Sequence, residues 1–235
     1  MNNKNSKSKN SKDKNNSSDK SVELWTPRTK LGKMVLEGKF TTLDEVIDSG
    51  YKIRESEIVD KLVPNIQSEI VFIGGSPGKG GGSRKTPTRR TSRMHSSGRR
   101  FKISAMVIVG DGNGHVGIGF SEGVDNRDAI NKATRLAKIN IFRVNRGCGS
   151  LECRCGKPHS IPMKVEGKCG SVKVVLIPAP KGIGLCASAE AKKFLRLAGI
   201  KDIWFKSFGN TGSRVNFLYA IENAFKNLNK KKIGE

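Results

Sequence analysis

Apolar and polar residues form their clearest pattern in the middle of the chain. Residues 103–109 (ISAMVIV) have the composition of a β-strand. Residues 111–114 (DGNG) are typical of a hairpin turn, and residues 115–120 then alternate with period two, which predicts a returning strand. The apolar side chains of that second strand, those of Val116, Ile118 and Phe120, fall on one face.

The spacing then changes to that of a helix, from about residue 126 to residue 141. The apolar stripe of this predicted helix consists of Ala129, Ile130, Ala133, Leu136 and Ala137. A strand, a hairpin, a second strand and a helix together predict a first α+β domain.

A similar order of elements is predicted in the second half of the chain. Residues 172–177 form an apolar strand stopped by Pro178, residues 189–198 a helix that closes at Gly199, and residues 200–208 a strand. Ser213 is expected to cap a last helix, whose apolar side is formed by Val215, Leu218, Ala224, Phe225 and Leu228. These elements predict a second, small α/β domain.

Two short helices are expected before the first domain. Residues 42–45 (TLDE) form a capping box and Gly50 provides the stop, so we expect a helix over 42–49. A further helix is expected over 55–62, ending before Pro64.

The resulting domain plan has six parts. We expect a disordered basic tail over 1–21, a helical extension over 22–63, the first domain over 64–146, a Cys- and Gly-rich connector over 147–160, the second domain over 161–228 and a basic tail over 229–235.

Charge suggests the class of partner. The chain has 44 Lys and Arg against 21 Asp and Glu, a net charge of +23, which favours a polyanion: nucleic acid first and an anionic membrane surface second. The sequence has no apolar run of membrane-spanning length and no apolar leader at its start, so no membrane partner is expected. Five cysteines, three of them within eight residues, favour a reducing, cytoplasmic compartment over a disulfide framework.

The positive charge is concentrated in residues 74–102, which contain nine basic residues and no acid. The glycine-rich residues 74–82 are expected to be a flexible linker, and the whole run a basic loop that binds RNA phosphates. The candidate RNA contacts in it are Arg84, Lys85, Arg89, Arg90, Arg93, Arg99, Arg100 and Lys102. Further candidates outside it are Arg143, Arg146, Lys157, Lys168 and Lys181. A protein-binding loop is the alternative.

Two glycine patterns resemble nucleotide-binding motifs. Residues 112–117 (GNGHVG) match G-x-G-x-x-G, but a strand rather than a helix follows, so a tight hairpin and close backbone packing are favoured. The run that contains Lys79 lacks the Ser or Thr that a phosphate loop needs, because Gly80 stands there.

A cluster of potential metal ligands lies in the connector. Cys148, Cys153, Cys155 and His159 supply the three thiolates and one imidazole of a tetrahedral zinc site. Their spacing is tighter than in ordinary zinc ribbons, so reduced thiols in a glycine-rich connector are the alternative. The two other cysteines, Cys169 and Cys186, are expected to be small core residues.

Several ordered motifs resemble one family. They are residues 98–102 (GRRFK), 109–119 (VGDGNGHVGIG), 167–172 (GKCGSV), 176–184 (LIPAPKGIG) and 197–202 (LAGIKD). With these motifs the chain resembles the fifth protein of the small ribosomal subunit over about residues 22–228. Residues 25–32 and 156–159 are similar to its archaeal and eukaryotic branch, and the cysteine cluster looks archaeal.

The resemblance implies a double-stranded-RNA-binding-like first domain and a left-handed βαβ unit in the second. It also implies a structural, non-enzymatic role in the small subunit: binding rRNA and supporting assembly and decoding accuracy. The implied neighbours are the subunit's second, fourth and eighth proteins and messenger RNA near the path by which it enters. The competing hypotheses are a free double-stranded-RNA-binding regulator and a nucleotide-dependent enzyme.

Overall fold

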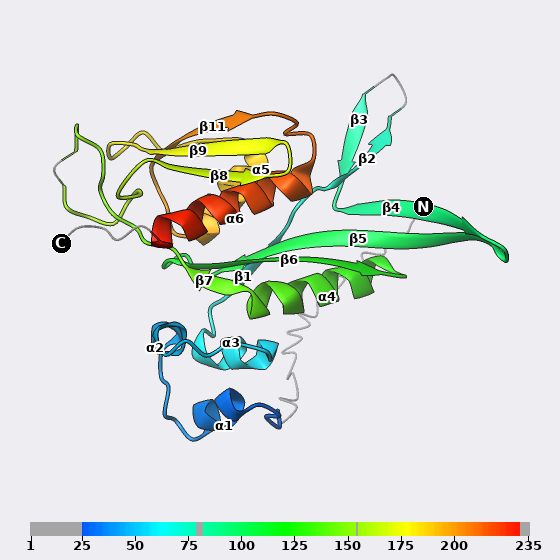
Figure 1. Cartoon of the computed structure of the whole chain (residues 1–235), viewed down its shortest axis with the longest axis horizontal. Helices are drawn as coiled ribbons and strands as arrows, with labels where there is room; N and C mark the ends of the chain where they lie inside the picture. The colour runs from blue at the N-terminus through cyan, green and yellow to red at the C-terminus, as the bar shows by residue number, and fades with distance from the viewer. Residues whose placement is uncertain (1–24, 79–81, 154, 231–235) are drawn as a thin grey trace, which may run out of the picture.

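The computed structural model describes residues 25–78, 82–153 and 155–230 (Figure 1). The disordered tail expected over 1–21 lies outside these residues, as do Lys79, Gly80 and residues 231–235 of the expected C-terminal tail. No helix within the described residues is both long and apolar enough to cross a membrane.

A long antiparallel sheet forms the centre of the molecule. Its strands are β1 (Gln67–Ile70), β4 (Thr88–His95), β5 (Gly98–Gly110), β6 (His115–Gly123) and β7 (Ile141–Arg143). The order is β1-β5-β6-β7, and β4 also pairs with β5. The predicted strand–hairpin–strand unit is confirmed as β5 and β6, which pair from Ile103 opposite Gly123 to Gly110 opposite Val116.

Both faces of β5 are buried from Ser104 to Gly110, and successive residues point to opposite faces. Ala105, Val107 and Val109 pack into a cluster with α4 (Asn126–Ile139), which covers one face of the sheet (Figure 1). Met106 and Ile108 pack into the cluster that contains the second half of the chain. The continuous apolar run in the sequence is therefore a strand with a core on each side.

Three short helices complete the α4 side of the molecule. They are α1 (Lys30–Leu36), α2 (Leu43–Asp48) and α3 (Ser56–Leu62), all placed beyond α4 in Figure 1. The Thr42 hydroxyl accepts from the Glu45 N–H and Gly50 has a φ of 74°, so the predicted start and stop of the first expected helix are confirmed.

The second half forms a four-stranded sheet with two helices. Its strands are β8 (Val165–Cys169), β9 (Val172–Pro178), β10 (Leu185–Cys186) and β11 (Ile203–Phe208), in the order β10-β11-β9-β8. The helices are α5 (Ala189–Leu197) and α6 (Arg214–Lys230). Strand β10 pairs in parallel with β11, and α5 connects the two, which is a βαβ unit.

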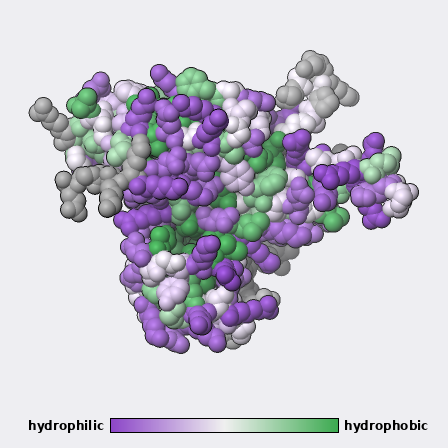
Figure 2. Space-filling model, viewed as in Figure 1, coloured by the Kyte–Doolittle hydropathy of each residue, from purple (hydrophilic) through white to green (hydrophobic). Residues whose placement is uncertain are grey.

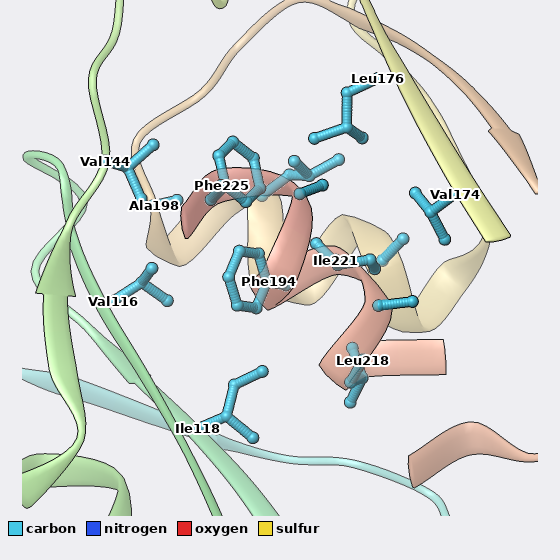
Figure 3. Packing of buried hydrophobic residues seen from close by; sticks show 14 of the residues in the cluster. Val116, Ile118, Val144, Val174, Leu176, Phe194, Ala198, Leu218, Ile221 and Phe225 are labelled. Carbon is cyan, nitrogen blue, oxygen red and sulfur yellow. The ribbon is translucent and has the colours of Figure 1, made fainter. Parts of the chain in front are cut away.

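One hydrophobic cluster joins the two halves. Phe194 of α5 and Phe225 of α6 stack with ring centroids 5.5 Å apart. Figure 3 shows these rings between Val116 and Ile118 of the central sheet and Leu176 of β9. The two α/β units therefore share a core along their joint.

The structure corrects the expected basic loop. The described part of the expected linker belongs to a hairpin of β2 (Gly74–Pro77) and β3 (Ser83–Thr86), and the rest of the run belongs to β4 and β5. Antiparallel backbone pairing holds these strands, and the mostly polar, exposed residues of β4 show no apolar period.

Smaller expectations were also wrong. Leu136 is 39% exposed, although the helical stripe included it, and Cys186 is exposed on the short strand β10 rather than in the core. The helix α4 ends at Ile139, because Ile141 already pairs with Gly117 in β7. The strand predicted from residue 200 begins at Ile203.

Candidate nucleic-acid interface and metal cluster

Strands β4 and β5 run past the end of the sheet as a hairpin that projects from the body of the molecule (Figure 1). The pairing extends from Thr88 opposite Ala105 to His95 opposite Gly98. All six candidate contacts on these strands are exposed: Arg89, Arg90, Arg93, Arg99, Arg100 and Lys102. Figure 2 shows the projection as a mostly hydrophilic arm.

Little negative charge compensates this hairpin. Arg93 lies directly across from Arg100, a like-charge pair that disfavours strand pairing. Lys102 has one acidic neighbour, Glu122, at 3.7 Å, and both side chains are exposed. Arg90 instead stacks on the Phe101 ring, with its guanidinium carbon 3.7 Å from the ring centroid. The hairpin thus keeps most of its charge available for an external anion.

The remaining candidates of the basic run lie on the neighbouring hairpin. Arg84 and Lys85 are exposed on β3, which pairs with β2 beside the base of the β4 strand. They add positive charge near the projecting hairpin without belonging to it.

A second group of cations lines a groove between the two halves. Three of its residues were sequence candidates, namely Arg146, Lys157 and Lys181. Sequence reasoning missed two others, Arg196 in the last turn of α5 and Lys201 just after it. None of these five has an ion-pair partner among the described residues. We call this surface the basic groove.

Two candidates lie outside both groups. Arg143 faces Asp44 at 3.6 Å and Asp48 at 3.7 Å, so its charge is partly used within the protein. Lys168 is exposed on β8, at the edge of the second sheet.

The glycine motif serves packing, as the sequence indicated. Gly112 and Gly114 have φ values of 73° and 111° in the turn, and β6 rather than a helix follows. A Cβ at Gly117, the last glycine of the motif, would lie 2.2 Å from the Ala137 carbonyl oxygen, which explains how α4 can lie directly on the sheet.

The structure brings the four predicted metal ligands together. The connector is closed by hydrogen bonds between Gly147 and Ser160, and within it the ligand atoms of Cys148, Cys153, Cys155 and His159 all lie within 4.8 Å of one another. The Cys148 and Cys155 sulfurs are 3.6 Å apart, and the Cys153 sulfur is 3.6 Å from His159 Nε2.

These distances fit one tetrahedral ion. With Zn–S near 2.3 Å and Zn–N near 2.0 Å, ideal angles place sulfurs about 3.8 Å apart and a sulfur about 3.5 Å from the nitrogen. The cluster could therefore hold a metal ion.

The thiols are electrostatically unequal. The backbone N–H of Lys181, followed by the thiol of Cys155, lowers the pKa of Cys153 to about 6. Burial, followed by hydrogen bonding to the thiols of Cys153 and Cys155, raises the pKa of Cys148. A thiolate is therefore more readily formed at Cys153 than at Cys148, and thiolates are the ligands that bind metal.

A carboxylate that sequence reasoning missed holds the histidine. His159 and Asp202 are only 5% and 4% exposed, and His159 Nδ1 lies 2.9 Å from Asp202 Oδ2. The contact turns Nε2 toward Cys153. The two residues are 43 positions apart, and no spacing in the sequence indicated that they meet.

Comparisons with known proteins agree with this architecture. Residues 87–145 match the family "Ribosomal protein S5, N-terminal domain", and residues 167–233 match "Ribosomal protein S5, C-terminal domain". The chain is similar to proteins named "Small ribosomal subunit protein uS5". That of Nanoarchaeum equitans is 47% identical over 91% of both chains. That of Methanococcoides burtonii is 48% identical over 87% of this chain and 90% of its own length. The chain belongs to the ribosomal protein S5 family, as its sequence motifs indicated.

Proposed function

We propose that the β4–β5 hairpin is the main rRNA contact of this chain. As a member of the S5 family, the chain is a structural component of the small ribosomal subunit in the cytoplasm and not an enzyme. The observation that carries the proposal is the projecting hairpin itself, whose six exposed cations have one ion-pair partner, Glu122, among the residues that the structure describes. Arginine forks on an accessible strand pair suit the phosphate oxygens of folded RNA.

The test removes charge at the tip of the hairpin. Arg99→Ala with Arg100→Ala should leave the fold intact, because both side chains are exposed. The control, Lys39→Ala with Lys173→Ala, removes the same charge from exposed cations that are paired with Glu37 and Glu166.

RNA affinity is measured against salt, and incorporation is followed by sedimentation. Each lost phosphate contact should reduce the slope of log K against log salt by about 0.7–0.9, so the arginine pair should reduce it by about 1.5 and the control pair by much less. The arginine variant should also compete poorly with wild type for incorporation into subunits that co-sediment in a sucrose gradient. Equal slopes and equal incorporation would refute the role of the hairpin.

The other sequence candidates extend this interface. We propose that Arg84, Lys85, Arg89, Arg90, Arg93 and Lys102 contact the same RNA as the hairpin tip, that Arg146, Lys157 and Lys181 contact RNA through the basic groove, and that Arg143 and Lys168 make isolated contacts. The second, fourth and eighth proteins of the subunit, and messenger RNA near its way into the subunit, are the proposed neighbours.

Two finer features of the fold are also proposed. The central sheet with α4 on one face is consistent with a double-stranded-RNA-binding-like domain over 64–146. The unit β10-α5-β11 within 161–228 is proposed to be the left-handed βαβ unit that the family resemblance implies. A helical extension over 22–63 and a connector over 147–160 complete the proposed domain plan.

We further propose that the Cys148–Cys153–Cys155–His159 cluster binds one zinc ion. The ligand types and the two 3.6 Å separations support a tetrahedral site. Protein purified without chelator should contain close to one zinc per chain. Cys153→Ser with Cys155→Ser should lose it, whereas Cys186→Ser, which alters an exposed thiol outside the cluster, should keep it. Metal-free wild-type protein with its native fold would refute the site.

A further inference from the structure

The neighbours of Asp202 connect the metal cluster to the basic groove. Its two carboxylate oxygens serve different partners. Oδ2 contacts His159 Nδ1, and Oδ1 accepts hydrogen bonds from the backbone N–H groups of Gly182 and Gly184 at 3.0 and 2.8 Å. One buried carboxylate thus holds both the imidazole of the cluster and the loop that carries Lys181.

The same cluster holds a second segment of the groove. Lys157 lies midway between Cys155 and His159 in the chain, so one cluster ligand stands two residues before it and another two residues after it. The His159 carbonyl oxygen in turn accepts from the backbone N–H groups of Lys201 and Asp202 at 2.9 and 3.1 Å. The connector is therefore attached to the start of β11 through both the side chain and the backbone of His159.

Two cations of the groove, Arg146 and Arg196, are positioned independently of the cluster. Arg196 belongs to the last turn of α5, whose packing against the core involves Phe194 and Leu197. Arg146 donates to the carbonyl oxygen of Asn113 in the β5–β6 turn. One wall of the groove thus rests on α5 and the β5–β6 turn, and the other rests on two loops that meet at the cluster.

We propose that Asp202 is a positioning residue that couples the metal cluster to the loop of Lys181, so that metal loading fixes one wall of the basic groove and strengthens its binding of an RNA phosphate backbone. This inference rests on the zinc site proposed above. The groove suits a polyanion because Asp202 is the only acid among the described residues that line it, and its carboxylate is already used by His159, Gly182 and Gly184.

The first experiment measures zinc affinity of the full chain by competition with a chromophoric chelator. A carboxylate on the second nitrogen of a metal-bound histidine typically contributes 10–100-fold to metal affinity. Asp202→Asn should therefore lower zinc affinity by about that factor and shift the absorption bands of the cobalt-substituted protein. Glu152→Gln removes the same charge from an exposed connector residue and should change neither.

The second experiment measures binding of a 20-nucleotide single-stranded RNA over a range of salt, with zinc bound and after chelation. Lys157→Ala with Lys181→Ala should reduce the slope of log K against log salt by about 1.5 in the zinc-loaded protein and by less than about 0.3 in the chelated protein. Arg146→Ala with Arg196→Ala, which alters the two groove cations that are positioned independently of the cluster, should reduce it equally in both. Hydrogen exchange at the Gly182 and Gly184 amides should accelerate when zinc is removed.

The outcomes separate the two proposals. If wild type holds no zinc, both the zinc site and the coupling are wrong. If wild type holds zinc but Asp202→Asn changes the affinity less than threefold, the zinc site stands and the positioning role is wrong. If Lys157→Ala with Lys181→Ala has the same effect with and without zinc, the dependence of the groove on metal is wrong.

Discussion

A single methyl group at Gly110 should test how the two halves of the chain are joined. Gly110 ends β5, and a Cβ built there would lie 2.5 Å from the Leu197 carbonyl oxygen and 2.9 Å from the Leu197 Cβ. That carbonyl also accepts the Gly112 N–H at 2.9 Å. Gly110→Ala therefore has to push the end of α5 away from the β5–β6 turn.

The cost can be calculated from these contacts. Forcing an extra methyl into a closely packed site costs about 1–3 kcal/mol, and loss of the Gly112 hydrogen bond adds about 0.5–1.5 kcal/mol. We expect a free energy of unfolding lower by about 2–4 kcal/mol, which for a chain of this size lowers Tm by roughly 5–12 °C.

Urea and thermal unfolding monitored by circular dichroism would measure the change. Gly82→Ala is the matched control, because a Cβ there meets no atom of the described residues within 4 Å and its φ is not in the left-handed region. If Gly110→Ala stayed within 0.5 kcal/mol of Gly82→Ala, the close approach of Gly110 to α5 would not limit stability and the joint would be looser than described.

Three further substitutions test separate parts of the structure. Phe225→Ala, which empties half of the stacked aromatic pair, should cost about 3–5 kcal/mol in urea unfolding. Ser188→Ala removes the side chain that caps α5 and should cost about 1 kcal/mol by the same assay. Burial alone would lower the pKa of His115, but its hydrogen bonds to Asp111 and Asp44 outweigh burial and raise that pKa above its usual 6.5. The stability that protonated His115 confers is complete below the pKa of the unfolded histidine and is lost as pH rises through the raised folded pKa. The free energy of unfolding is measured over a pH series, and the same loss of stability in His115→Gln would contradict this assignment.

The sequence predicted those elements whose apolar residues recur at strand or helix spacing and lie on the buried face of the element. The alternation of Val116 and Ile118 indicated β6, and the three alanines Ala129, Ala133 and Ala137 indicated the face of α4 that lies on the sheet. Leu136 misled the helical prediction because the close approach of α4 to the glycines of β6 leaves room only for alanine on that face.

Strands β4 and β8 could not be found in this way. The residues of β4 are hydroxyl, basic and exposed, so no apolar period distinguishes them from a loop. In β8 the inward position between Val165 and Cys169 is Gly167, where a Cβ would lie 2.2 Å from the Ala220 carbonyl oxygen of α6. The close approach of α6 requires glycine at this inward position, and because glycine is not an apolar side chain, the alternation of apolar and polar residues in β8 is not visible in the sequence.

The candidate site was predictable to the extent that its residues are close in sequence. The four residues of the cysteine cluster lie within twelve positions, so their composition suggested a metal site before the structure brought them together. Asp202, Arg196 and Lys201 reach the same region from the second domain, and only the folded chain shows that they do. Contacts between distant segments carry no local signal in one sequence.

The hairpin differs in stability along its length, and this follows from where β5 is buried. From Ser104 to Gly110 the strand lies between two hydrophobic clusters, so the base of the hairpin is held by the core of the whole molecule. From Gly98 to Lys102, toward the tip, β5 pairs with β4 alone among the described strands, and in this pairing Arg93 lies opposite Arg100. Like charges opposite one another weaken strand pairing, and a bound polyanion would remove that repulsion. A firmly held base with a tip that gains order from its anion suits a protein that must dock on folded RNA, because the base sets the direction while the tip adjusts to the local backbone.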